Sequence, residues 1–90
     1  MIVIRNYPLL DYGPVYIFNM PIGAKILGIF KPQMEYIICA EVDTNNQLES
    51  RKFKFFHPDQ QITEDPMFRE YIGSTPSWNT LCHLYEIFPE

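Results

Sequence analysis

The sequence lacks the features that mark membrane-spanning and secreted proteins. Its longest unbroken apolar runs are a few residues, whereas a helix that crosses a bilayer needs about 20. The opening residues, MIVIRN, have no basic start, no apolar segment of signal-peptide length and no cleavage site of small residues. We therefore expect a protein that contacts no membrane and works in the cytoplasm.

A surplus of basic residues is also missing. The 90 residues include 7 Lys and Arg against 11 Asp and Glu, which gives a formal net charge of −4. Because a protein that follows a nucleic-acid backbone needs a basic face, we expect no direct contact with nucleic acid. Cysteine is scarce as well, with only Cys39 and Cys82, both in apolar stretches. In a cytoplasmic protein both are predicted to be buried, reduced thiols, and the sequence leaves their separation in space open.

No motif for catalysis or cofactor binding is present. The G-x-S-x-G elbow, the P-loop and the dinucleotide-binding fingerprint are all absent. Among the histidines and cysteines only Cys82 and His83 are close in sequence, and neighbouring strand residues point to opposite faces of a sheet. We predict no enzymatic activity, no catalytic residue, no metal site and no cofactor.

The sequence does have enough apolar residues for one small core. Apolar residues make up 47% of the chain and aromatic residues 16%, which predicts a single domain over residues 1–90. Short segments that alternate apolar and polar side chains are separated by turn residues, and no segment keeps a helical period. This pattern predicts an all-β domain, a small antiparallel sandwich or partly open barrel of five to seven strands with at most one short helical turn.

The expected strands follow from the alternation. They cover residues 2–7, 15–20, 22–30, 34–43, 51–57, 69–74 and 80–88. Segment 34–43 is apolar on both faces, which predicts a central strand covered on both sides, and 34–57 resembles a hairpin. Pro8 and Pro21 are expected to end their strands, because proline cannot donate to a strand ladder.

Turn residues between the strands carry further expectations. Gly23 is expected to bend the chain at a sheet corner, and Gly28, within a strand, to mark a bulge or a close backbone approach. The connection 58–67 contains two prolines and is expected to be irregular, with Thr63 capping one helical turn. Residues 75–79, TPSWN, predict a turn.

The stretch RKFKFFH at 51–57 alternates cations and aromatic rings, as some single-strand nucleic-acid-binding surfaces do. We favour a two-sided strand with Arg51 and Lys54 in solvent and the phenylalanines in the core. His57 ends this strand before Pro58. Its ring would either contact a phosphate or a partner carboxylate, or hold the connection in place by bonding a loop carbonyl.

Six segments of the chain together resemble one known family. They are NYPL (6–9), MPIGAKIL (20–27), VD (42–43), RKFKFFHP (51–58), YIGS (71–74) and CHLYE (82–86). In these segments the chain resembles a family of small proteins of unknown function from tailed bacteriophages, with the pattern M-P-x-G-A-K-I-L, H-P, Y-I-G and H-x-F/Y-E. The resemblance covers nearly the whole chain. It implies a compact β fold and a phage source and, by context alone, action on host proteins.

Two functions are consistent with these observations. In the first, the protein is a non-catalytic phage accessory protein in the host cytoplasm that binds and inhibits a host bacterial protein, such as a component of anti-phage immunity. The partner-binding surface would be an edge formed by the 58–67 connection and the 75–79 turn, because long loops and turn-borne aromatic residues often bind partners. The residues expected to contact the partner are Trp78, Glu64, Asp65 and Asp59.

In the alternative, the protein sequesters a nucleotide signal between protomers. The residues expected to bind the ligand are His57, Arg51, Lys54 and a stacking Trp78. The two functions differ in where the cations lie, since a sequestering site needs them to converge in one pocket. The sequence leaves the oligomeric state open, with a homodimer as one alternative.

Overall fold

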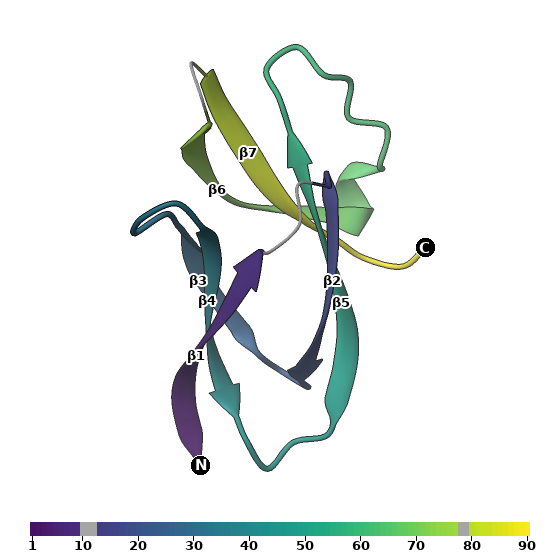
Figure 1. The fold of residues 1–90 in the computed structure, drawn as a ribbon. Coiled ribbons are helices and arrows are strands. Elements are labelled where there is room, and N and C mark those ends of the chain that lie inside the picture. The colour runs from purple at the N-terminus through teal and green to yellow at the C-terminus, as the bar shows by residue number, and fades with distance from the viewer. Residues whose placement is uncertain (10–12, 78–79) are drawn as a thin grey trace.

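Seven strands and one short 3₁₀ turn make up the structure, a computed structural model that describes residues 1–9, 13–77 and 80–90 (Figure 1). The elements are β1 (Ile2–Leu9), β2 (Val15–Pro21), β3 (Lys25–Phe30), β4 (Tyr36–Asp43), β5 (Leu48–Phe56), η1 (Pro66–Phe68), β6 (Arg69–Ser77) and β7 (Thr80–Ile87). They form two antiparallel sheets with strand orders β1-β4-β3 and β2-β5-β7-β6, packed as a sandwich. The predicted all-β class is confirmed, in the sandwich form.

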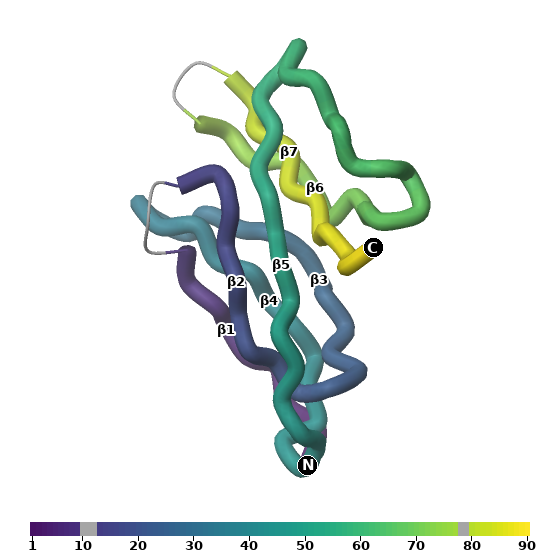
Figure 2. The backbone as a smooth tube through the Cα atoms, turned by 90° about the vertical axis from the view of Figure 1, so that its right-hand side faces the viewer, coloured from purple at the N-terminus to yellow at the C-terminus, as the bar shows by residue number. Residues whose placement is uncertain are grey.

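Each sheet directs alternate side chains into the space between the two sheets. β4 buries Ile38 and Ala40 there, and β5 buries Phe53 and Phe55. Figure 2 shows β5 running in front of β4 instead of beside it in one sheet. The predicted 34–57 hairpin is therefore wrong. Alternation is the same whether successive strands pair in one sheet or face each other across a core, so the pattern does not distinguish the two.

The chain passes from one sheet to the other three times, between β1 and β2, between β2 and β3, and between β4 and β5. β2 leads to β3 through a turn in which Gly23 has a φ of +83°, a left-handed conformation that disfavours residues with a Cβ. The predicted corner at Gly23 is confirmed. The connection between β4 and β5, residues 44–47, lies against the β2–β3 turn, because the Ile22 N–H donates to the Gln47 carbonyl over 2.7 Å.

Three prolines lie inside edge strands. Pro8 belongs to β1, Pro21 to β2 and Pro76 to β6, and each of these strands has a partner on one side only. An edge strand tolerates proline because the missing N–H can face away from the ladder. The expected strand ends before Pro8 and Pro21 are therefore wrong by one or two residues, and the expected turn at 75–79 begins too early, since β6 continues to Ser77.

Two glycines mark irregular pairing. The register of β3 against β4 shifts between Ile26 and Gly28, so the predicted bulge is confirmed. A second shift lies between Tyr71 and Gly73 in β6. A Cβ on Gly73 would lie 3.2 Å from the Cγ2 atom of Ile29. The sheets thus approach closely where β6 faces β3.

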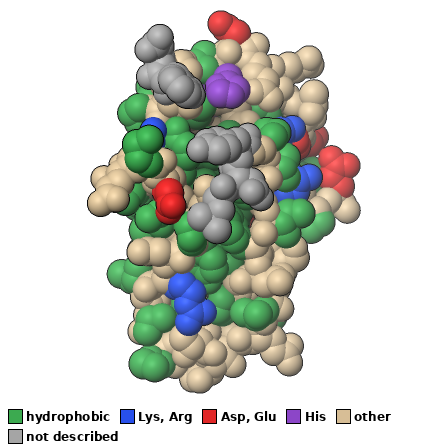
Figure 3. Space-filling view, in the orientation of Figure 1, with side chains coloured by type: hydrophobic (Ala, Val, Ile, Leu, Met, Phe, Trp, Pro, Cys, Tyr) green, Lys and Arg blue, Asp and Glu red, His purple; other side chains and the backbone are tan. Residues whose placement is uncertain are grey.

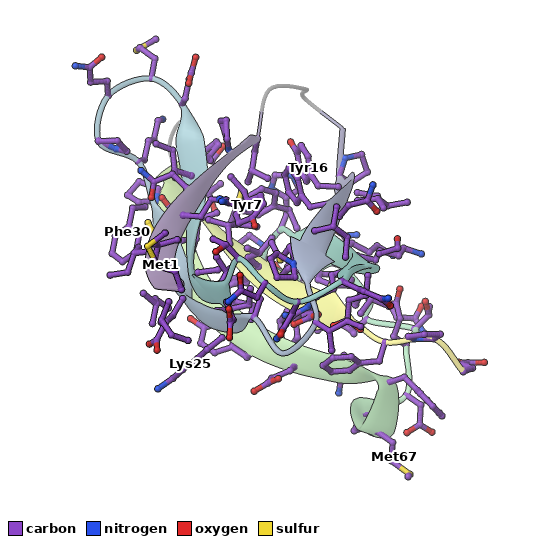
Figure 4. All side chains as sticks on the ribbon, turned by 90° about the horizontal axis from the view of Figure 1, so that it is seen from below. Met1, Tyr7, Tyr16, Lys25, Phe30 and Met67 are labelled. Atoms are coloured by element: carbon purple, nitrogen blue, oxygen red, sulfur yellow. The ribbon has the colours of Figure 1, made fainter. Side chains whose placement is uncertain are left out.

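The core fills the space between the sheets. Its buried residues are Leu9, Met20, Ala24, Ile29, Ile38, Ala40, Val42, Phe53, Phe55, Cys82 and Leu84. Aromatic rings extend it between β1 and β2, where the ring centres of Tyr7 and Phe18 are 5.6 Å apart. In Figure 4, Tyr7 and Tyr16 lie among the side chains between the sheets.

Only one face of β4 is buried. Ile38, Ala40 and Val42 point into the core, whereas Cys39 is half-buried and Glu41 is exposed on the other face. The prediction of a central strand is confirmed, but cover on both sides is wrong. Cys39 is correspondingly less buried than expected.

The connection between β5 and β6 is irregular apart from η1, as predicted. Asp65 caps η1, since its Oδ1 accepts from the Met67 N–H over 2.9 Å. The predicted cap, Thr63, lies two residues too early, because Pro66 occupies the first position of the turn and places the cap at Asp65.

Candidate functional site

Arg51, expected to bind a ligand, lies on the inward side of β5 and is already engaged. Its Nε and Nη2 atoms each donate to a Glu86 carboxylate oxygen over 2.6 Å, and Nη1 donates to the Ala24 carbonyl over 2.5 Å. The Arg51 and Glu86 side chains are 14% and 4% exposed. The hydrogen bonds to Glu86 raise the pKa of Arg51 in spite of its partial burial. The expectation that Arg51 lies in solvent is wrong, because Arg51 is on the same inward side of the strand as Phe53.

Lys54 points outward from β5 and is also paired. Its Nζ lies 3.1 Å from Glu64 Oε2 and 5.0 Å from the centre of the Phe56 ring. Burial disfavours the Glu64 carboxylate, but hydrogen bonds from Lys54 and the backbone outweigh it and lower the pKa of Glu64. Phe56 is 2% exposed although it also points outward. The expectation that Lys54 lies in solvent is wrong, because the connection folds against this side of β5 and brings Glu64 to it.

His57 lies close to a cysteine. Its Nδ1 is 3.3 Å from Cys82 Sγ, and the His57 N–H donates to Gln60 Oε1 over 3.0 Å. The backbone of His57, and not its ring, bonds the following turn. Cys82 points inward and His83 outward, so the prediction that these neighbours lie on opposite faces is confirmed.

The Cys82–His57 pair lines a cavity of about 460 Å³ between the sheets. Tyr16, Tyr36 and Phe55 supply aromatic walls. A single sequence does not show that His57 and Cys82 meet. Once β5 and β7 are known to pair with Phe55 opposite Leu84, counting two residues along each strand brings His57 to Cys82.

The remaining predicted partner-binding residues are not brought together by a described contact. Asp59 is exposed in the turn after His57 with a φ of +65°. Asp65 caps η1 and Glu64 pairs with Lys54. Trp78 lies outside the described residues.

The cations of the alternative site do not converge. Arg51 faces Glu86 in the sandwich, Lys54 faces Glu64 on the outer side, and only His57 of the described candidates lines the larger cavity. On the face seen in Figure 3, Lys and Arg side chains are dispersed among hydrophobic and acidic ones. Among the described residues, no group of three His, Cys, Asp or Glu side chains is placed to hold a metal ion.

An apolar surface lies on the outer side of the three-stranded sheet. Pro8 of β1 and Phe30 of β3 both pair with Ile37 of β4, so these side chains form a row across the sheet. Ile4 and Ile2 lie farther along the same side of β1, beyond Asn6 and opposite Glu41 and Asp43. We call the five apolar residues, Ile2, Ile4, Pro8, Phe30 and Ile37, the outer apolar face.

Nothing described packs over this face. Ile4 is 68% and Phe30 51% exposed, and no further element of the described chain lies beyond this sheet. In Figure 4, Phe30 and Met1 lie on the same side of the molecule, at its periphery. Sequence reasoning missed this surface, because a run such as IVI suggests burial. The available signal was that apolar residues occupy both sides of the first strand.

A second polar cluster lies on the outer side of the four-stranded sheet. Ser74 and His83 are paired residues of β6 and β7, and Ser74 Oγ lies 2.6 Å from His83 Nδ1. The Tyr71 hydroxyl also bonds Ser74 Oγ. Serine catalysis additionally needs donors that hold an oxyanion next to the nucleophile. Ser74 and His83 line neither the cavity of about 460 Å³ nor the smaller pocket beside Arg51 and Glu86.

Comparisons with known proteins add no relative. The chain matches no protein-family model, and no curated protein or solved structure matches it. In the part of the chain that the structure describes, no helix has the length and apolar character needed to span a bilayer.

Proposed function

We propose that this chain is a non-catalytic phage accessory protein that binds and inhibits a host bacterial protein through its outer apolar face. The observation that carries the proposal is the exposure of Ile4 and Phe30 on a sheet face that no described element covers. Large apolar side chains that gather exposed on one face of a small protein commonly mark an interaction site. The resemblance to phage proteins supports the host context.

The chemistry of the face indicates the kind of partner. Lys25 and Glu41 lie farther along the same side of the sheet from the row of Pro8, Ile37 and Phe30. They are opposite each other on the neighbouring strands β3 and β4. The formal charge of the whole chain is −4. The complementary partner is a protein with an apolar patch, which supplies affinity, and a net basic charge, because opposite overall charge speeds association.

The arrangement of cations favours this function over nucleotide sequestration. A sequestering site would use Arg51 and Lys54, and both are held by carboxylates of the same chain. Releasing either cation would leave a partly buried carboxylate without its partner, which opposes ligand binding there.

The test is recovery of the partner from host lysate with a tagged protein, quantified by mass spectrometry. The wild type is compared with Phe30→Ser and with the control Ile17→Ser, whose side chain is 64% exposed on the opposite sheet. We expect a stoichiometric host protein with the wild type and the control, and its loss with Phe30→Ser. The recovered protein is then assayed for inhibition of its activity.

Other outcomes would contradict the proposal. Equal recovery by Phe30→Ser would place the interface elsewhere, and loss with Trp78→Ala would assign it to the edge predicted from sequence. A nucleotide released from the denatured protein, detected by ultraviolet absorbance, would favour sequestration. A stable homodimer that dissociates in Phe30→Ser would show that the face binds a second copy.

A further inference from the structure

The cavity between the sheets is separate from the outer apolar face and contains the described chain's closest pairing of a thiol with an imidazole. Its volume of about 460 Å³ falls within the range of pockets for small molecules. Three of its lining residues, Tyr16, Tyr36 and Phe55, are aromatic. These features suit a compact ligand with an apolar body.

The Cys82–His57 pair gives this cavity a nucleophile and a base. Sγ and Nδ1 are 3.3 Å apart, within hydrogen-bond reach for sulfur. Cys82 is only 5% exposed and is held on the inward side of β7. His57 is exposed, so its ring can exchange protons with water. A positioned histidine that takes the proton of a cysteine is the usual way in which proteins activate a thiol.

We propose that Cys82 is a reactive thiol that captures a small α,β-unsaturated carbonyl compound in this cavity. His57 Nδ1 accepts the thiol proton while sulfur forms a bond to the β-carbon of the compound. The π electrons of the carbon–carbon double bond move to the α-carbon as an enolate, which then takes the proton back from His57. The net reaction is an addition, so no oxidant, reductant or leaving group is required.

The class of compound follows from the site. Sulfur is a soft nucleophile that adds readily to activated carbon–carbon double bonds, and the aromatic wall accepts the apolar part of such a molecule. The adduct leaves Cys82 consumed, so capture is stoichiometric and differs from enzymatic turnover. Cys39 provides an internal comparison: it is half-buried on the outer side of β4, and its Sγ lies 3.2 Å from Asn6 Oδ1, which is not a base.

The test treats the native, reduced protein with N-ethylmaleimide and follows both cysteines by peptide mass spectrometry. We expect Cys82 to react at least about tenfold faster than Cys39 despite its greater burial, a small part of the 10²–10⁴ that a positioned base contributes. His57→Gln should slow Cys82 about tenfold or more and leave Cys39 unchanged. His83→Gln, which changes the other histidine, should alter neither rate.

Two results would overturn the proposal. One is a wild-type protein in which Cys39 reacts first or Cys82 reacts only in denaturant, which would show a thiol that is merely buried. The other is an unchanged Cys82 rate in His57→Gln, which would remove the base. The ratio of the Cys82 rate to the Cys39 rate in the wild type tests the proposal without any variant. A thermal melt of His57→Gln checks that this substitution of an exposed residue leaves the fold intact.

Discussion

The Arg51 guanidinium connects three parts of the sandwich. It bonds Glu86 on the neighbouring strand β7 and the Ala24 carbonyl at the turn into β3, which belongs to the other sheet. A carboxylate as buried as Glu86 needs such a partner, because removing one member of a buried pair leaves an uncompensated charge. The arginine that the sequence places among candidate ligands is a structural residue of the core boundary.

We predict that Arg51→Met lowers the free energy of unfolding by about 3 kcal/mol, the scale for breaking a buried ion pair. The control Lys52→Met lies one residue along and is exposed, so it should change stability by less than about 0.5 kcal/mol. Urea unfolding followed by tryptophan fluorescence measures both. The double variant Arg51→Met/Glu86→Leu should recover part of the loss, and failure to recover would indicate that Arg51 acts through packing alone.

Glu64 makes a contribution to the stability of the fold that depends on pH. Its pKa is lowered in the folded state from 4.5, since hydrogen bonds outweigh the effect of burial. A lowered folded pKa stabilises the fold above the unfolded value and is lost as pH falls through the folded value. We predict that wild type exceeds Glu64→Gln in stability at pH 7, by at most about 1 kcal/mol, and that the gap closes below pH 4.5.

Thermal melts from pH 7 to pH 3 measure this difference. Glu41→Gln serves as the control, because Glu41 is exposed and forms no ion pair among the described residues. A gap that stays constant with pH would show that the Lys54–Glu64 contact does not hold in solution.

At the scale of elements, each edge strand carries a device against pairing with another chain. Proline lies within β1 and β6 and ends β2, and a bulge at Gly28 interrupts β3. Unpaired edges otherwise template aggregation, and proline and bulges are common protections. A partner is therefore expected to use a face of the sandwich, not a strand edge.

We predict that Pro8→Thr/Pro76→Thr increases self-association, because threonine restores an N–H donor and has high strand propensity. Sedimentation velocity over a concentration series should show a smaller monomer fraction than in the wild type. Pro32→Thr, in the exposed loop before β4, is the matched control and should behave as the wild type. Unchanged sedimentation of the double variant would show that these prolines do not protect the edges.

Alternation along each segment was sufficient to predict the strands. It was not sufficient to predict the sheet to which a strand belongs. The sequence predicts that β4 and β5 pair as a hairpin, whereas in the structure they face each other across the core. The partners of the candidate functional residues were likewise not predictable from the sequence. Arg51 and Lys54 have their partners 35 and 10 residues away in sequence, and only the tertiary fold brings these carboxylates to them.

The whole molecule has two unequal outer sides. On the four-stranded sheet, the connection after β5 folds over Phe56 and pairs Glu64 with Lys54. On the three-stranded sheet, Ile4 and Phe30 remain exposed and no described element lies above them. The chain thus covers part of one side with its own loop, leaving Val15 and Ile17 of β2 exposed there, whereas no described element covers the other side. This asymmetry is why we assign the interaction to the outer apolar face.

The final prediction separates binding from stability on that face. Ile4→Ser/Phe30→Ser should weaken binding to the recovered host protein by about 2 kcal/mol or more, the cost of losing an interface anchor. The free energy of unfolding should fall by less than about 1 kcal/mol, because both side chains are largely exposed in the free protein. The control Val15→Ser/Ile17→Ser removes two exposed apolar side chains from the opposite sheet and should preserve affinity. Titration calorimetry and thermal melts on all three proteins give the two quantities. Equal loss of affinity in both double variants would indicate non-specific apolar adhesion, and a large loss of stability in the first would show that Ile4 and Phe30 support the fold instead of a partner.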